Sequence, residues 1–283
     1  MKLDRAALEA HPLPSVEVDS DKESKGRILV VAGSRDVPGA ALLTATAAMR
    51  AGAGQLRIAT VDSVAISLGV QMPEAMVVGL ADDGKGGFAT AAVESIVEQA
   101  GEVDAVVAGP GVRRSEACAA IATALIEGRA ALVLDVAFLK TLRPSAHDRH
   151  TAPVLLPDAD ELASLLDCDK EAVGSDPVGC GLRAARTYRS VVLVKGPPSR
   201  VVCPSGDVWT QEAGTPGLGV SGSGDVLAGI VGGLLARGAE PLSALLWGVW
   251  LHSEAGAVLA KKVGPVGFLA RQIADEIPGL LPR

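Results

Sequence analysis

The sequence lacks a cluster of basic residues. It has 33 acidic residues against 26 lysines and arginines, which gives a formal net charge of −7 at pH 7. Proteins that bind nucleic acids usually hold the phosphate backbone with a basic patch or stripe. Because neither the overall charge nor any local run of charge provides one, we expect no nucleic-acid partner.

Cysteine is also scarce. The chain has four cysteines, and none of them has the C-x-x-C spacing of a common metal or redox motif: Cys118, Cys168, Cys180 and Cys203. A chain of 283 residues can bury a large core and does not need disulfide bonds for stability. We therefore expect reduced thiols and a cytoplasmic location, and we assign the cysteines no metal.

Long apolar runs are absent as well. The longest, Val226 to Ala236, is shorter than the roughly 18 residues that indicate a membrane-spanning helix. The N-terminal stretch from Met1 to Pro14 mixes charged residues with short apolar pieces, which is not the pattern of a signal peptide. With 48% hydrophobic residues, the chain is expected to fold as a soluble protein without a membrane partner.

The sequence does contain an alternation of short β-branched runs with alanine-rich helical segments. This pattern is typical of an α/β fold with a largely parallel central sheet flanked by helices. Short apolar runs predict strands buried on both faces at residues 28–32, 56–59, 105–108, 131–135, 154–156 and 191–194. Helices are predicted at residues 39–52, 64–68, 90–100, 116–127, 159–166, 179–187, 225–237 and 242–260. Residues 201–202 and 208–211 flank a turn and predict a β-hairpin.

A glycine-rich segment, Ser221-Gly222-Ser223-Gly224-Asp225, precedes the helix predicted at residues 225–237. Glycines allow the backbone to approach a ligand closely, and the first free N–H groups of the helix would face an anion placed there. An acid beside a bound polyphosphate is electrostatically costly, so Asp225 is best explained as a base that takes a proton from the hydroxyl receiving a phosphoryl group. The motif alone equally allows a first-turn acid that stabilises the helix.

Other candidate segments also follow predicted strands. Gly33, Gly109-Pro110-Gly111, Pro157-Asp158 and Lys195-Gly196 each come directly after a strand. In an open α/β sheet, ligands bind beyond the carboxyl ends of the strands, so these segments are expected on one rim. The segment from Gly33 to Gly39 fits neither a P-loop nor a G-x-G-x-x-G dinucleotide loop.

Taken together, these segments resemble the ATP- or ADP-dependent NAD(P)H-hydrate dehydratases, a family with a ribokinase-like fold. The similarity is densest from Lys195 to Gly238 and covers roughly residues 24–278. It implies a single ribokinase-like domain at residues 24–283 after an N-terminal arm at residues 1–23, with no room for the epimerase domain that often accompanies the family. It also implies dehydration of hydrated NADH or NADPH back to the reduced cofactor, a metabolite repair reaction.

The resemblance assigns roles to individual residues. Asp225 is the implied general base, and the N–H groups around Gly222, Ser223 and Gly224 stabilise the transferring phosphoryl group, aided by Mg²⁺. The implied partners are the hydrated dinucleotide and ADP or ATP as co-substrate, and assembly into a homo-oligomer is left open; no protein residue is assigned as a metal ligand. The nucleotide would contact Lys195, Gly196, Pro197, Pro198, Ser199 and Gly224, and the substrate would contact Ala40, Gly111, Asp158 and Asp225.

Four residues at three places depart from the family pattern. Asp158 stands where many members have histidine, Pro197 and Pro198 each remove a backbone N–H beside the nucleotide, and Arg113 replaces a small residue. Two alternatives therefore stay open. One is a ribokinase-like small-molecule kinase with the same Asp225, and the other is a nucleotide-binding relative with weakened or lost turnover.

Overall fold

The computed structural model describes residues 1–15, 25–144 and 151–282. Within these residues nine strands form one sheet in the order β3-β2-β1-β4-β5-β6-β7-β8-β9. The seven strands from β3 to β7 in this order are parallel, and β8 and β9 continue the sheet as an antiparallel hairpin. The strands are β1 (Arg27–Val31), β2 (Gln55–Val61), β3 (Ala75–Leu80), β4 (Ala105–Ala108), β5 (Ala131–Leu134), β6 (Val154–Leu155), β7 (Val191–Val194), β8 (Ser199–Val202) and β9 (Val208–Gln211).

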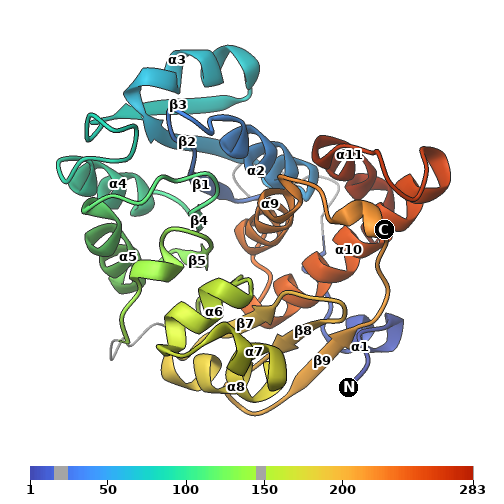
Figure 1. Ribbon diagram of the computed structural model, residues 1–283. Coiled ribbons are helices and arrows are strands. Elements are labelled where there is room, and N and C mark those ends of the chain that lie inside the picture. The colour runs from blue at the N-terminus through green and yellow to red at the C-terminus, as the bar shows by residue number, and fades with distance from the viewer. Residues whose placement is uncertain (16–24, 145–150, 283) are drawn as a thin grey trace.

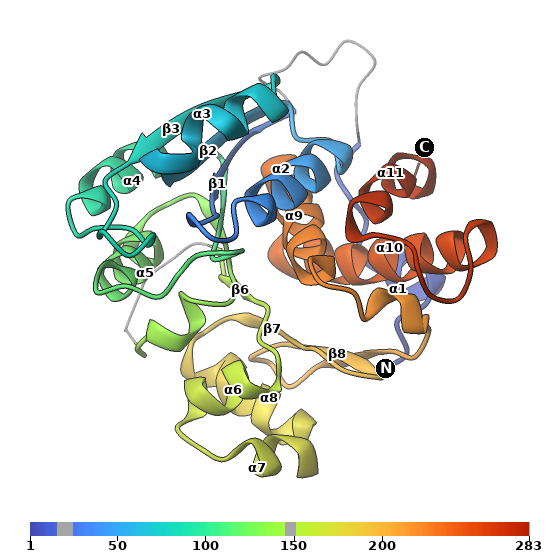
Figure 2. The same cartoon turned by 45° about the horizontal axis from the view of Figure 1, so that its top comes forward.

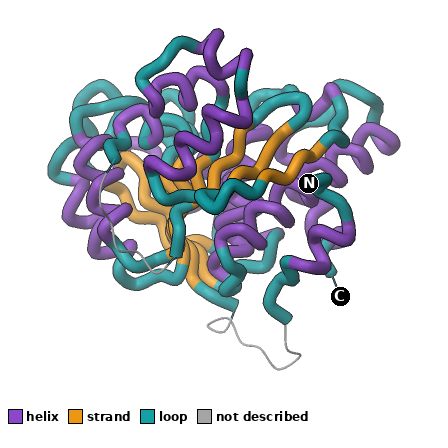
Figure 3. Tube along the Cα trace, turned by 90° about the horizontal axis from the view of Figure 1, so that it is seen from below, coloured by secondary structure: helices purple, strands orange, loops and turns teal. Residues whose placement is uncertain are grey.

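Helices cover both faces of the sheet (Figures 1 and 3). Alternate residues of β1 point to opposite faces: Ile28 and Val30 belong to one core, and Leu29 and Val31 to the other. The first core lies under α2 (Gly39–Arg50), α9 (Ser223–Ala236), α10 (Pro241–Lys262) and α11 (Ala270–Leu280). The second core lies under α4 (Ala92–Ala100), α5 (Ala117–Glu127), α6 (Ala159–Leu166) and α8 (Pro177–Thr187).

This architecture confirms the predicted α/β class and the ribokinase-like arrangement of a mostly parallel sheet between helices. The predicted strands and helices are all present, with ends shifted by a few residues at most; helix α3 (Asp62–Gln71) is the largest extension. The prediction missed β3, an edge strand whose sequence AMVVGL is apolar like those of the predicted strands but whose residues are mostly half-buried or exposed. It also missed the helices α1 (Arg5–Ala10), α7 (Lys170–Ser175) and α11.

The first 15 residues pack against the domain (Figure 2). The N–H of Leu3 donates to the Thr210 carbonyl at 2.8 Å, and the Thr210 N–H donates to the Met1 carbonyl at 2.9 Å, so the chain start lies beside β9. Leu3 and Leu8, the latter in α1, are buried in the first core. The rest of the predicted arm, residues 16–24, lies outside the described residues, and the domain boundary at residue 24 stays a prediction.

Helix α10 is the longest helix among the described residues. By length and composition it is the one described helix apolar enough to cross a membrane. However, 61% of its apolar window is buried inside the protein, where it packs against α9 and α11. Its composition is therefore that of a core helix. His252, Ser253 and Glu254 interrupt the apolar residues of its sequence.

Candidate active site

The glycine-rich segment forms the turn that starts α9. Gly222 is the residue before the helix, and its φ of +88° lies in the left-handed region. A Cβ at this position would also lie 2.5 Å from Leu43 Cδ1, so the turn requires glycine. The helix begins at Ser223, two residues earlier than predicted, and Asp225 lies in its first turn.

The backbone N–H groups of this turn are not equivalent. The Ser223 N–H donates to the Val220 carbonyl at 3.1 Å, so it is used within the turn. The N–H groups of Gly224 and Asp225 have no hydrogen-bond partner among the residues that the structure describes. The start of a helix carries partial positive charge, and these two N–H groups are the ones available to an anion. The predicted anion site counts the Ser223 N–H among its donors; the structure gives that N–H a partner inside the protein.

Asp225 is held in a half-buried position. Its backbone carbonyl accepts a hydrogen bond from Thr44 Oγ1 at 3.1 Å, which ties the first turn of α9 to α2. Burial raises the pKa of the Asp225 carboxyl to about 6; the charge of Asp135 adds to this rise, and Lys195 opposes it. Helix-dipole stabilisation alone would lower the pKa of a first-turn acid. A carboxyl with a pKa near 6 is largely ionised at pH 7 and can still accept a proton, which suits a general base.

Lys195 and Asp135 form an ion pair at the carboxyl ends of β7 and β5. Lys195 Nζ lies 2.9 Å from Asp135 Oδ1, and the Asp135 side chain is 1% exposed against 25% for Lys195. The Val136 N–H donates to the same carboxylate oxygen at 3.0 Å. Burial disfavours the Lys195 ammonium, but Asp135 outweighs this effect and the pKa of Lys195 is raised. Full burial raises the pKa of Asp135, and Lys195 opposes that rise. Lys195 is therefore a charged group fixed in place.

The same ammonium borders the start of α9. Lys195 Nζ lies 3.8 Å from the position that a Cβ on Gly224 would take. The turn that follows is partly exposed, with the Ser199 hydroxyl donating to the Gly196 carbonyl at 2.9 Å and a cis peptide bond between Pro197 and Pro198. The structure thus brings Lys195, which follows β7, next to Gly224; that both residues contact one nucleotide stays a prediction.

Asp158 is the N-cap of α6. Its carboxylate accepts from the Glu161 N–H at 2.8 Å, and Glu161 Oε2 accepts from the Asp158 N–H at 2.9 Å, which is a complete capping box. Burial raises the pKa of Glu161, and the hydrogen bond from the Asp158 backbone opposes this. Asp158 therefore has a structural role as a helix cap. The sequence analysis considers it only as a substrate contact that replaces the histidine of the family. Its side chain is exposed, and its negative charge contributes to raising the pKa values of the nearby Asp135, Glu161 and Lys195.

Ala40 and Gly111, the predicted substrate contacts, touch each other. Gly111 has a φ of +64°, and a Cβ on it would collide with the Ala40 side chain. The loops are tied further by the Gly33 N–H, which donates to the Pro110 carbonyl at 2.8 Å. Ala40 also lies one helical turn before Thr44, whose hydroxyl bonds to Asp225. The structure thus links both predicted substrate residues to the start of α9 through α2.

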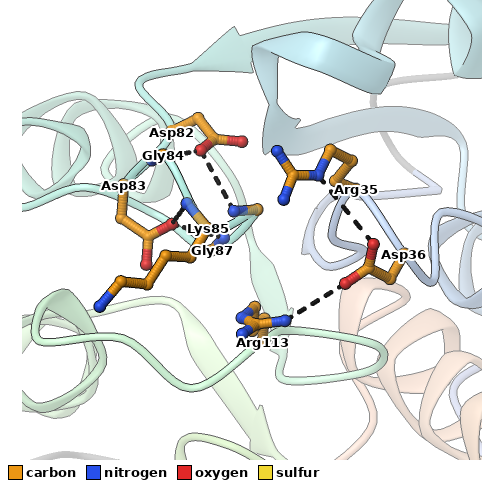
Figure 4. A network of polar contacts seen from close by, with 9 residues as sticks. Arg35, Asp36, Asp82, Asp83, Gly84, Lys85, Gly87 and Arg113 are labelled. Carbon is orange, nitrogen blue, oxygen red and sulfur yellow. Dashed lines mark hydrogen bonds and ion pairs between the residues drawn. The ribbon is translucent and has the colours of Figure 1, made fainter.

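Arg113, the residue that departs from the family pattern, belongs to a polar network beside this contact. Arg113 Nη1 lies 3.3 Å from Asp36 Oδ2, and Arg35 lies on the other side of the same carboxylate (Figure 4). The loop after β3 closes the network, because the Arg35 N–H donates to the Gly86 carbonyl at 3.2 Å. The arginine is accommodated at the loop surface by this ion pair.

His252 approaches the site from α10. Its Nε2 lies 3.0 Å from Ser223 Oγ and 3.1 Å from the Ser223 carbonyl oxygen. A carbonyl can only accept, so Nε2 carries the proton of the neutral ring. Burial lowers the pKa of His252 to about 4, so the ring is neutral at pH 7. The only sequence signal for this contact is a single histidine in an apolar helix.

The described residues contain no group of three or more metal-ligating side chains. Mg²⁺ commonly keeps several waters and binds through substrate phosphates and one or two carboxylates, so the site does not need such a group. Asp135 and Glu161 are the buried carboxylates nearest to Lys195 that could contribute through water.

Three comparisons agree with this architecture. The family profile described as NAD(P)H-hydrate dehydratase matches residues 28–279. The chain is 45% identical over 281 residues to the ADP-dependent (S)-NAD(P)H-hydrate dehydratase of Xanthomonas campestris pv. campestris, covering 98% of this chain and 95% of that protein. It spans about half the length of the bifunctional NAD(P)H-hydrate repair enzymes that it also matches.

Solved structures support the fold. An ADP/ATP-dependent NAD(P)H-hydrate dehydratase from Bacillus subtilis, co-crystallised with ATP/Mg²⁺, superimposes with a TM-score of 0.85 at 24% identity, covering 99% of this chain and 96% of that one. A ribokinase-like superfamily protein from Enterococcus faecalis gives a TM-score of 0.81 at 23% identity, over 98% and 93% of the two chains. The fold is therefore ribokinase-like. By the match of residues 28–279, the chain belongs to the NAD(P)H-hydrate dehydratase family.

Proposed function

We propose that this chain dehydrates hydrated NADH and NADPH at the expense of a nucleoside phosphate, and that ADP is the donor. The placement of Asp225, Lys195 and the Gly224 N–H at one point carries the proposal. This placement brings together a base of raised pKa, a fixed cation and helix N–H groups that are available to an anion. Phosphoryl transfer to a hydroxyl uses all three kinds of group. The donor follows from the name of the Xanthomonas relative.

In the proposed reaction, Asp225 takes the proton from the hydroxyl on the hydrated ring while that oxygen attacks the terminal phosphorus of the nucleotide. The bond between this phosphorus and the bridging oxygen breaks, and the nucleotide leaves one phosphate shorter. The Gly224 and Asp225 N–H groups and Lys195 stabilise charge on the transferring group. Mg²⁺, when bound to the nucleotide phosphates, would neutralise part of their charge.

The second step removes the new phosphate ester. Hydroxide is a poor leaving group, whereas the phosphate leaves readily as the ring nitrogen donates its electron pair. Loss of a ring proton then restores the reduced nicotinamide. The products are NADH or NADPH, inorganic phosphate and the shortened nucleotide. Ala40 and Gly111 would line the ring side of this site, in a soluble, cytoplasmic enzyme.

The test is to incubate the protein with enzymatically hydrated NADH, Mg²⁺ and either ADP or ATP, and to follow the return of reduced-nicotinamide absorbance. We expect recovery only when nucleotide and Mg²⁺ are both present, and faster recovery with ADP. A stable phosphorylated alcohol as the product would instead identify a small-molecule kinase. Recovery without any nucleotide would contradict the mechanism.

A further inference from the structure

A cavity of about 820 Å³ has no part in the chemistry described above. It is lined by the loop after β3, the loop after β4 and the segment around residues 140–143 that follows β5. The two loops are in contact, because a Cβ on Gly87 would lie 3.0 Å from the Arg113 carbonyl and 3.2 Å from Ser115 Cβ. Its volume falls within the range of small-molecule sites in proteins.

The lining is basic in a protein whose overall charge is −7. Four exposed cationic side chains line the cavity, and none of them forms an ion pair within residues 1–15, 25–144 and 151–282: Lys85, Arg114, Lys140 and Arg143. Two acids, Asp83 and Glu116, also line it. Asp83 is already engaged, since its Oδ1 accepts from the Lys85 N–H at 2.8 Å and the Gly87 N–H at 2.9 Å. Four cations against two acids leave the lining with a net positive charge.

Figure 4 shows how one of these cations, Lys85, differs from the neighbouring arginines. Arg35 and Arg113 point toward Asp36, whereas the Lys85 side chain extends away from all three. The helix starts add to the positive potential of the cavity. Both α4 and α5 begin beside it, and neither has a side-chain cap on its first turn. Each of these features favours a negatively charged ligand.

The cavity lies within reach of the predicted substrate contacts. Arg114 is three residues from Gly111, and three residues of extended chain span at most about 11 Å. Lys195, the cation predicted to hold the nucleotide donor, follows β7, which is separated from β4 by β5 and β6. A dinucleotide with its reacting ring between Ala40, Gly111 and Asp225 would extend its other half away from Lys195.

We propose that this cavity binds phosphate groups on the half of the dinucleotide that is remote from the reacting ring. This inference rests on the proposed function and names a second contact region for the same substrate. The groups available are the diphosphate, present in both hydrated NADH and hydrated NADPH, and the 2′-phosphate, present only in the latter. Thr90 and Ser115 contribute hydroxyl groups to the same lining, whereas the Thr141 hydroxyl donates to the Ala137 carbonyl at 3.3 Å.

The experiment compares wild type with Lys85→Ala, Lys140→Ala and the double variant, which alter two separate loops through exposed side chains. Lys261→Ala, an exposed lysine at the end of α10, is the matched control. For the double variant we expect KM for the hydrated dinucleotide to rise about tenfold or more, as for loss of charged hydrogen bonds, with kcat nearly unchanged. Circular dichroism melts would check that the variants remain folded.

Calorimetric titration with NADH and NADPH gives a readout that does not depend on turnover. We expect the double variant to bind them about tenfold more weakly than wild type. An effect on both ligands assigns the cavity to the diphosphate, and an effect confined to NADPH assigns it to the 2′-phosphate. If the double variant binds both dinucleotides with unchanged affinity and has an unchanged KM, the cavity proposal is overturned. The proposed function would still be upheld as long as the wild type is active. If the wild type is inactive but the double variant still binds the dinucleotides more weakly, the proposed function is overturned and the cavity proposal is upheld.

Discussion

Lys195 Nζ lies 2.9 Å from Asp135 Oδ1 and 3.8 Å from the Cβ position of Gly224, so one ammonium group joins the ends of β5 and β7 to the start of α9. Lys195 also lowers the pKa of Asp225, which Asp135 raises. Burial is the main cause of the raised pKa of Asp225, and residues that follow two other elements, β5 and β7, adjust that pKa further.

Asp225→Asn should lower the dehydration rate by roughly a hundredfold or more, the size expected for loss of a general base. Nucleotide affinity should stay equal or become slightly tighter, because a negative charge beside the polyphosphate is removed. Calorimetry and the absorbance assay on one preparation would measure both. If Asp225 only stabilised the helix, turnover would be almost unchanged.

The rate should fall as the pH drops through about 6, because the carboxylate of Asp225 must be ionised to accept a proton. Stability should show the opposite trend. The folded pKa exceeds the ordinary value of 3.8, so ionisation destabilises the fold increasingly from about pH 4 up to pH 6, above which the cost is complete. At pH 7.5, Asp225→Asn should be more stable than wild type by up to about 3 kcal/mol. Denaturant melts at pH 4 and pH 7.5 would test this, and a difference equal at both pH values would contradict it.

Lys195→Met should destabilise the protein by about 3 kcal/mol or less, because it leaves Asp135 buried without a partner while Lys195 itself is partly exposed. The double variant Asp135→Asn/Lys195→Met should recover much of this loss, since no charge stays unpaired. Nucleotide affinity should remain weak in both variants. Recovery of affinity in the double variant would show that Lys195 acts only on stability.

Gly224→Ala separates the effect of this position on phosphate binding from its effect on the stability of the helix. Gly224 has no left-handed φ, and the nearest group to an added Cβ is Lys195 Nζ at 3.8 Å. Alanine in a helix should stabilise the fold by about 0.5–1 kcal/mol relative to glycine. The methyl group would nevertheless occupy the space between the ammonium and the helix start, so we expect KM for ADP to rise at least tenfold, as for a lost charged contact. Gly174→Ala, a helical glycine in α7 with open space around its Cβ position, is the control and should not change KM.

Asp158→Ala should cost about 1 kcal/mol of stability through loss of the α6 cap, while Asp158→Ser should retain most of it. If Asp158 also binds substrate, both variants should raise KM for the hydrated dinucleotide. If KM is unchanged in both variants, Asp158 has only its capping role. Melting temperatures and KM values of the two variants would separate these contributions.

The sequence by itself determined the α/β class, most of the strands and helices, and the blocks that form the site. Buried parallel strands appear as short apolar runs, and the residues after them must lie on one rim because the strands point the same way. The edge strand β3 was missed although its sequence, AMVVGL, is also a short apolar run, and only the structure places it at the edge with most of its residues half-buried or exposed.

Only the tertiary structure decided how side chains from distant segments pair. It placed Ser223 against His252, used the Ser223 N–H within its own turn, and made Asp158 a helix cap. It also left Lys85 and Lys140 without ion-pair partners among the described residues, although they lie 55 positions apart and line one cavity. Local patterns fix an element and its buried face. Hydrogen-bond partners and pKa values depend instead on which groups the packing of the sheet and helices brings within a few ångströms.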